Sequence, residues 1–249
     1  MTRVKICGCM RVEDVLAAKD AGADFVGLMF APSSRRRISI EEAQALVEAA
    51  GSPLRDLGQS EPPPLHRGAA TDAAAWFMEG AKALERLLAR KHPLTVGVFE
   101  NQPLEDVNEI SDEVGLDLIQ LSGHESWGDC LLANRQVVKT IELPPNLPAE
   151  QIMAELEAGS AIACLLDPSR GRGLEADSDL AAAIAAHVPL WLAGGLSPDN
   201  VSAAIRHVQP WAVDVSSGVE TNGAKDGAKI QAFVEAARRA ISNSVERSA

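Results

Sequence analysis

The sequence predicts a single α/β domain folded as a closed (β/α)₈ barrel of the TIM type, on three observations. The chain has 249 residues, close to the roughly 250 of one such barrel. Short apolar runs alternate with Ala- and Glu-rich stretches of helical spacing, giving eight strand–helix repeats. No Gly-x-Gly-x-x-Gly motif follows the first strand, where Cys7-Gly8-Cys9 stands instead. An open Rossmann or flavodoxin-like sheet needs fewer strands and would leave some runs unplaced.

The first repeat is a complete strand–helix–strand unit. A β-prone run at 4–8 ends at a glycine, and apolar residues then recur at helical spacing from Val12 to Ala18, before Gly22. A nearly continuous apolar strand follows at 24–30. Further strands are expected at 94–99, 116–121, 136–141, 161–166, 189–193 and 211–215. Helices are expected at 103–114, 149–158, 178–187, 198–207 and 228–242, with a flexible tail at about 243–249.

Residues 51–92 do not fit a minimal barrel. Gly and Pro predict a loop over 51–71, whereas the spacing of Trp76, Leu84 and Leu88 predicts an amphipathic helix over 72–91. This insertion lies between a helix and the next strand, on the barrel face opposite the active site. We expect it to cover that end or to form a homo-oligomer contact; a regulatory role is the alternative.

Composition restricts the partners. The chain has 23 basic and 35 acidic residues and a net charge of −12, which disfavours nucleic acid and anionic membranes. A small anion can still bind backbone amides at helix N-termini. No apolar run reaches the ~20 residues of a membrane span. Four scattered cysteines without a secretory signal predict reduced thiols in a cytoplasmic protein.

Working residues in such a barrel stand at the carboxyl ends of the strands. Gly194-Gly195 follows the seventh strand and Ser216-Ser217-Gly218 follows the eighth. These are the loops that commonly bind phosphate in this fold, through amides that glycine leaves accessible. Each string alone is compatible with an ordinary turn, but their pairing at these two loops favours a phosphate site.

Cys7 and Asp167 end the first and sixth strands. Cys7 is either a small buried hydrophobe or a general base. Asp167 either caps a turn or acts as a general acid. The two strands flank the seventh and eighth in a closed ring, so an acid and a base would face a sugar phosphate from either side. Cys7-x-Cys9 has no further partner at metal-binding spacing, so we expect no metal.

Several strings together resemble the phosphoribosylanthranilate isomerase family, over nearly the whole chain outside 51–92. The matching segments are 4–8, 21–24, 32–39 with its arginines, 97–99, 120–121, 165–167, 194–201 and 213–220. The first and last are the most distinctive, and the order and separation of the segments fit the family.

The resemblance implies an isomerase of tryptophan biosynthesis that needs no cofactor. It would convert N-(5′-phosphoribosyl)anthranilate into 1-(2-carboxyphenylamino)-1-deoxyribulose 5-phosphate by an Amadori rearrangement. By the same resemblance, Cys7 is the general base at ribose C2′ and Asp167 the general acid at the ring oxygen. Arg36 would hold the anthranilate carboxylate, with Asp214 and Gln120 also in the substrate site. The alternative for the run 35–37 is a solvated loop.

Two departures from the family pattern affect the expected pocket. Ser122 stands where the family usually has histidine, and the loop after the sixth strand keeps Gly171 and Gly173 as candidate phosphate ligands but lacks the usual aromatics. Two alternatives therefore stay open: an isomerase of another aminosugar phosphate, and a non-catalytic binding protein. Cys7 and Asp167 argue against the second, since binding alone requires neither.

Overall fold

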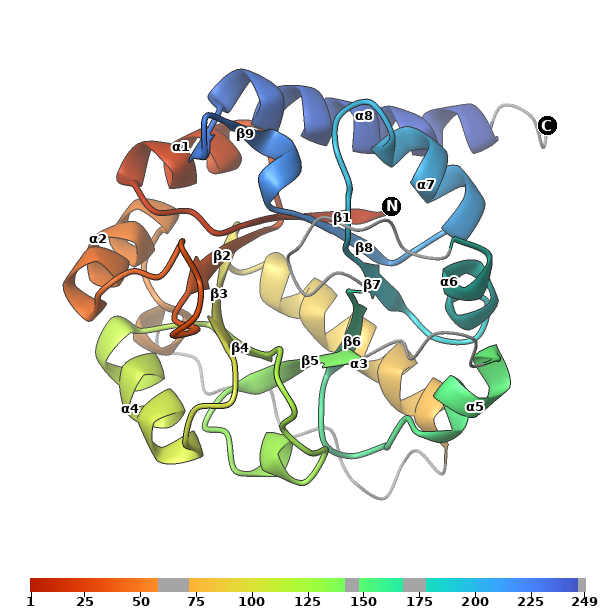
Figure 1. Cartoon of the computed structure of the whole chain (residues 1–249), viewed down its shortest axis with the longest axis horizontal. Helices are drawn as coiled ribbons and strands as arrows, with labels where there is room; N and C mark the ends of the chain where they lie inside the picture. Colours follow the sequence, from red (N-terminus) through yellow and green to blue (C-terminus); the bar gives the residue numbers. More distant parts are fainter. Residues whose placement is uncertain (58–71, 142–147, 168–177, 246–249) are drawn as a thin grey trace.

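The structure is a computed structural model that describes residues 1–57, 72–141, 148–167 and 178–245, the last five as backbone only. Within these residues, eight parallel strands pair in sequence order, and the eighth pairs with the first to close a barrel (Figure 1). The barrel strands are β1 Arg3–Cys7, β2 Phe25–Met29, β3 Leu94–Phe99, β4 Leu118–Leu121, β5 Gln136–Ile141, β6 Ala163–Leu166, β7 Leu190–Leu192 and β8 Ala212–Val215. The predicted barrel is confirmed.

The described α-helices are α1 Val12–Asp20, α2 Ile40–Ala50, α3 Ala73–Leu88, α4 Leu104–Val114, α5 Ala149–Ala154, α6 Ser178–Ala185, α7 Val201–Val208 and α8 Gly227–Val245. All of these except α3 surround the ring (Figure 1). Local sequence sets their ends: Ser39 and Glu42 form a reciprocal capping box at the start of α2, and Gly115 ends α4 in the left-handed conformation. None of the described helices is long and apolar enough to cross a membrane.

Each barrel strand is buried on both faces, because one face points into the barrel interior and the other packs against the helices. On β1, Val4 and Ile6 pack in the cluster beneath the helices. Inward-facing residues of other strands, among them Phe25 and Trp191, form a second cluster inside the barrel. This two-sided burial explains why the strands appear in the sequence as continuous apolar runs.

The C-terminal boundary was predicted too early. No glycine or proline interrupts 228–245, and α8 continues to Val245, so residues 243–245 of the expected tail are helical. Residues 246–249 lie outside the described residues.

Helix α3 of the insertion closes the amino-terminal end of the barrel. Trp76 Nε1 of α3 donates a hydrogen bond of 2.6 Å to the Ala161 carbonyl, just before β6. Leu84 and Leu88 join the barrel-interior cluster, and α3 crosses behind the ring in Figure 1. The expected cover of the face opposite the active site is confirmed, and the oligomer contact stays a prediction. A short 3₁₀ turn, Leu54–Leu57, precedes residues 58–71, which lie outside the described residues.

Candidate active site

A cavity of about 620 Å³ opens at the carboxyl ends of the strands, a volume suited to a small ligand. Ten predicted site residues lie within the described part of the chain, and all ten line this cavity. They are Cys7, Arg36, Gln120, Asp167, Gly194, Gly195, Asp214, Ser216, Ser217 and Gly218. The other two, Gly171 and Gly173, lie outside the described residues.

Cys7 and Asp167 stand on opposite sides of the two loops predicted to bind phosphate. Cys7 ends β1 and Asp167 directly follows β6, with β7 and β8 between them in the closed ring. Cys7 is buried and Asp167 is half-buried. Burial raises the pKa of the Cys7 thiol, and the nearby Lys5 ammonium opposes this rise. The Cys7 thiol and the Asp167 carboxyl therefore line the same cavity, one on each side of the loops after β7 and β8.

The loops after β7 and β8 are built on glycine. Gly194 and Gly195 have φ values of +95° and +63°, which side chains rarely adopt. A Cβ on Gly218 would lie 1.9 Å from the Leu196 carbonyl oxygen. The two loops therefore rest backbone against backbone and form one continuous rim of the cavity.

A chain of polar side chains crosses the floor of the site. Lys5 Nζ donates to Asp214 Oδ2 at 2.8 Å and to Gln120 Oε1 at 2.7 Å. Gln120 Nε2 in turn donates to Ser122 Oγ at 2.9 Å, and Ser122 Oγ lies 3.0 Å from Thr140 Oγ1. Ser122, where the family usually has histidine, is thus an integral member of this network.

Sequence reasoning missed Lys5 and Thr140. The signal for Lys5 was present, because it lies two residues before Cys7 and so projects from the same face of the strand. A lysine inside an otherwise apolar strand also requires a partner when buried. Thr140 carried no comparable signal, since threonine is common in strands.

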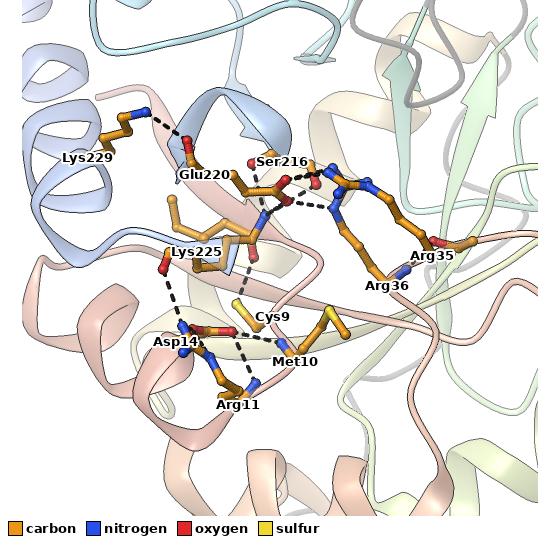
Figure 2. A network of polar contacts seen from close by, with 12 residues as sticks. Cys9, Met10, Arg11, Asp14, Arg35, Arg36, Ser216, Glu220, Lys225 and Lys229 are labelled. Atoms are coloured by element: carbon orange, nitrogen blue, oxygen red, sulfur yellow. Dashed lines mark hydrogen bonds and ion pairs between the residues drawn. The ribbon is translucent and has the colours of Figure 1, made fainter. Parts of the chain in front are cut away.

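Arg36 is held by a carboxylate at the mouth of the barrel. Its Nε and Nη2 donate to Glu220 Oε1 and Oε2 at 2.6 and 3.2 Å, and Arg35 contacts the same carboxylate (Figure 2). Lys225 Nζ also donates to Glu220, at 2.9 Å. Burial alone would raise the pKa of Glu220, but hydrogen bonds from Arg36 and Lys225 lower it to about 2.

Glu220 and Lys225 belong to a hairpin that was not predicted. Strands β9 Glu220–Thr221 and β10 Ala224–Lys225 pair antiparallel. They are joined by Asn222 and Gly223, both with positive φ, and Asn-Gly is a strong hairpin signal. Lys225 Nζ also donates to the Ser216 carbonyl at 2.9 Å, so the hairpin links Arg36 to the β8 loop.

Cys9 points away from the cavity. It packs in the cluster beneath the helices, and its Sγ donates to the Ile6 carbonyl at 3.7 Å. Across the described residues, no group of three or more His, Cys, Asp or Glu side chains could hold a metal ion.

The family model described as N-(5′-phosphoribosyl)anthranilate (PRA) isomerase matches residues 65–236. The chain belongs to the phosphoribosylanthranilate isomerase family. The phosphoribosylanthranilate isomerase of Roseiflexus castenholzii is 39% identical over 95% of this chain and 98% of its own length. That of Dehalococcoides mccartyi is 35% identical over 98% of this chain and 100% of its own.

Solved structures of phosphoribosylanthranilate isomerases have the same fold. The Thermus thermophilus structure is 30% identical, with a TM-score of 0.71 over 96% of this chain and 99% of its own. A second, 30% identical with a TM-score of 0.68 over 96% and 100%, is a complex with reduced 1-(o-carboxyphenylamino)-1-deoxyribulose 5-phosphate. The predicted family is therefore confirmed.

Proposed function

We propose that this chain catalyses the Amadori rearrangement of N-(5′-phosphoribosyl)anthranilate with Cys7 as general base and Asp167 as general acid. The main supporting observation is the cavity that holds both side chains on either side of the β7 and β8 loops. Family membership makes the chain an isomerase of tryptophan biosynthesis, which favours this reaction over another aminosugar phosphate or a purely binding role.

The first step opens the ribose ring. The Asp167 carboxyl transfers a proton to the ring oxygen while the C1′–O bond breaks, and the anilino nitrogen lone pair forms the C1′=N bond. The nitrogen becomes positively charged, and this iminium makes the C2′–H bond acidic. The substrate's own aromatic amine supplies the electron sink, so the proposed reaction needs no cofactor.

The second step moves the proton from C2′. The Cys7 thiolate takes that proton, and the C2′–H electron pair forms a C1′=C2′ bond while the iminium nitrogen regains its lone pair. The resulting enol-amine becomes the ketone when C1′ gains a proton and the C2′ hydroxyl loses one. No atom or electron is added overall, as an isomerisation requires.

The remaining residues would bind the two charged ends of the substrate. We assign the phosphate to Gly194, Gly195, Ser216, Ser217 and Gly218, whose loops meet at one rim. Arg36 would bind the anthranilate carboxylate through the guanidinium N–H groups that do not donate to Glu220. Gln120 would also contact the substrate, and Asp214 would lie near its anthranilate end. Asp214 lines the cavity, and its Oδ1 is buried without a hydrogen-bond partner among the described residues.

The cellular location and two further phosphate ligands belong to the same proposal. We place the enzyme in the cytoplasm, where thiols stay reduced, since all four cysteines are free. Gly171 and Gly173 remain predicted phosphate ligands.

Two substitutions test the assignment of acid and base. Cys7→Ala and Asp167→Asn should each lower kcat by roughly 10²–10⁴-fold, the usual contribution of such groups. Circular dichroism and thermal unfolding should stay near wild type. Cys9→Ala is the matched control, because Cys9 faces the helix layer, and it should keep near-normal kcat. Full activity in Cys7→Ala, or substrate binding without turnover in wild type, would contradict the proposal.

A further inference from the structure

Lys5 is a fully buried lysine next to the active-site cavity. Its exposed fraction is 0%, and an ammonium group is costly to bury unless it is paired and hydrogen-bonded. Its partners are Asp214, as an ion pair, and Gln120. Both partners line the cavity, whereas Lys5 is absent from the described cavity wall. Lys5 therefore lies beneath the cavity wall and contacts two of the residues that line it.

The third neighbour of Lys5 is the proposed base. Lys5 and Cys7 project from the same face of β1, and Gly27 of β2 pairs with Cys7 in the sheet register. A Cβ on Gly27 would lie 2.8 Å from Cys7 Sγ and 3.1 Å from Lys5 Cε. The thiol and the end of the lysine side chain thus occupy the space that this glycine leaves open.

We propose that Lys5 is a positioning residue for the isomerisation: its ammonium fixes Asp214 and Gln120 and supplies the positive charge against which Cys7 ionises. This inference rests on the proposed role of Cys7 as the base. Lys5 itself does not touch the substrate and transfers no proton.

The charged groups around Cys7 support the proposal that Cys7 is the base and Lys5 a positioning residue. Lys5 on β1 and Lys225 on β10 favour the thiolate, and Asp214 on β8 opposes it. On β2, the residue that pairs with Cys7 is the uncharged Gly27. Burial raises the pKa of the Cys7 thiol, and Lys5 is the largest opposing influence. Burial alone would lower the pKa of Lys5, but Asp214 and Cys7 more than offset this and raise it. Lys5 and Cys7 therefore each favour the charged form of the other.

The decisive measurement is the pH dependence of Cys7 alkylation in the free enzyme. Iodoacetamide modifies the thiolate, and mass spectrometry of the Cys7 peptide follows that residue alone. In Lys5→Met, we expect the apparent pKa of Cys7 to rise by about one unit or more. Its alkylation rate and kcat/KM at pH 7 should then fall by about tenfold or more, because a tenfold smaller fraction is ionised.

Lys91→Met is the matched control. Lys91 is also buried, at the opposite end of the barrel, and its Nζ lies 2.6 Å from Asp117 Oδ2. Its loss removes a comparable ion pair without altering the charge at Cys7, so the apparent pKa of Cys7 should stay at the wild-type value. An unchanged Cys7 pKa in Lys5→Met, or an equal shift in Lys91→Met, would overturn the inference.

Asp214→Asn gives a second test with the opposite sign. It removes the negative neighbour and leaves the Lys5 charge to act on Cys7, so the apparent pKa of Cys7 should fall. This test stands even if Lys5→Met does not fold, and an unchanged or raised pKa would overturn the inference. Failure of the proposed function can be distinguished from failure of the Lys5 inference, because it would appear as full activity in Cys7→Ala.

Discussion

Gly218 and Leu196 bring the loops after β7 and β8 into backbone contact. A Cβ on Gly218 would lie 1.9 Å from the Leu196 carbonyl oxygen and 2.9 Å from its carbonyl carbon. Because the obstruction is backbone, a side chain at 218 can be accommodated only if the loops after β7 and β8 separate.

Gly218→Ala should therefore weaken phosphate binding. We expect KM for the substrate and Kd for inorganic phosphate to rise by about tenfold or more, measured by steady-state kinetics and calorimetry. Gly128→Ala is the control, because among the described residues its Cβ would meet only Ser126 Oγ, at 3.4 Å, and it should bind phosphate normally. Unchanged phosphate affinity in Gly218→Ala would contradict the assigned phosphate site.

Arg36→Met should mainly raise KM. A charge-assisted hydrogen bond contributes about 1.5–3 kcal/mol, so losing the guanidinium should raise KM by about 10- to 100-fold, with a smaller change in kcat. Arg37→Met, at the exposed neighbouring arginine, should stay near wild type. Equal effects of the two substitutions would show that general charge, rather than Arg36 itself, holds the substrate.

Asp24 stabilises the amino-terminal end of the barrel in a pH-dependent way. Burial alone would raise the pKa of Asp24, but hydrogen bonds from His92, Arg238 and the Val4 amide lower it to about 2 from 3.8. A lowered carboxyl pKa stabilises the fold above pH 3.8, and this stabilisation disappears as the pH falls through 2. It amounts to about 2 kcal/mol, at 1.36 kcal/mol per pKa unit.

Urea unfolding of wild type and Asp24→Asn checks this expectation. The difference in unfolding free energy should be largest near pH 7 and should shrink by about 2 kcal/mol towards pH 2. Asp20→Asn, at an exposed carboxylate on α1, should show little difference at any pH. A difference between wild type and Asp24→Asn that does not vary with pH would contradict the lowered pKa.

Leu84→Ala tests whether α3 serves stability rather than chemistry. Leu84 is fully buried in the cluster that fills the barrel interior, and such a truncation costs about 2–5 kcal/mol. We expect that loss in urea unfolding, with kcat unchanged under conditions where the enzyme is folded. Met78→Ala, at an exposed position of the same helix, should change stability by less than about 0.5 kcal/mol. A large fall in kcat of folded Leu84→Ala would show that α3 influences the active site.

The sequence by itself predicted the strand order, the closed barrel and the family. It could do so because strand and helix periodicity are local, and because two buried faces make each strand a short apolar run. In a closed ring of parallel strands, all the carboxyl ends lie at the same end of the barrel. That placement predicts that Cys7, Asp167 and the two glycine loops face one shared pocket.

Only the tertiary structure decided which charges meet. Lys5 and Asp214 are 209 positions apart, and Arg36 and Glu220 are 184 apart, yet each pair is within hydrogen-bond distance. Neither pairing can be recognised from neighbouring residues in the sequence. The Lys5–Asp214 pair depends on closure of β8 onto β1, and the Arg36–Glu220 pair depends on the β9–β10 hairpin folding over the barrel mouth. Periodicity places a side chain on a face, but the partner of a buried charge is fixed by the closed ring as a whole.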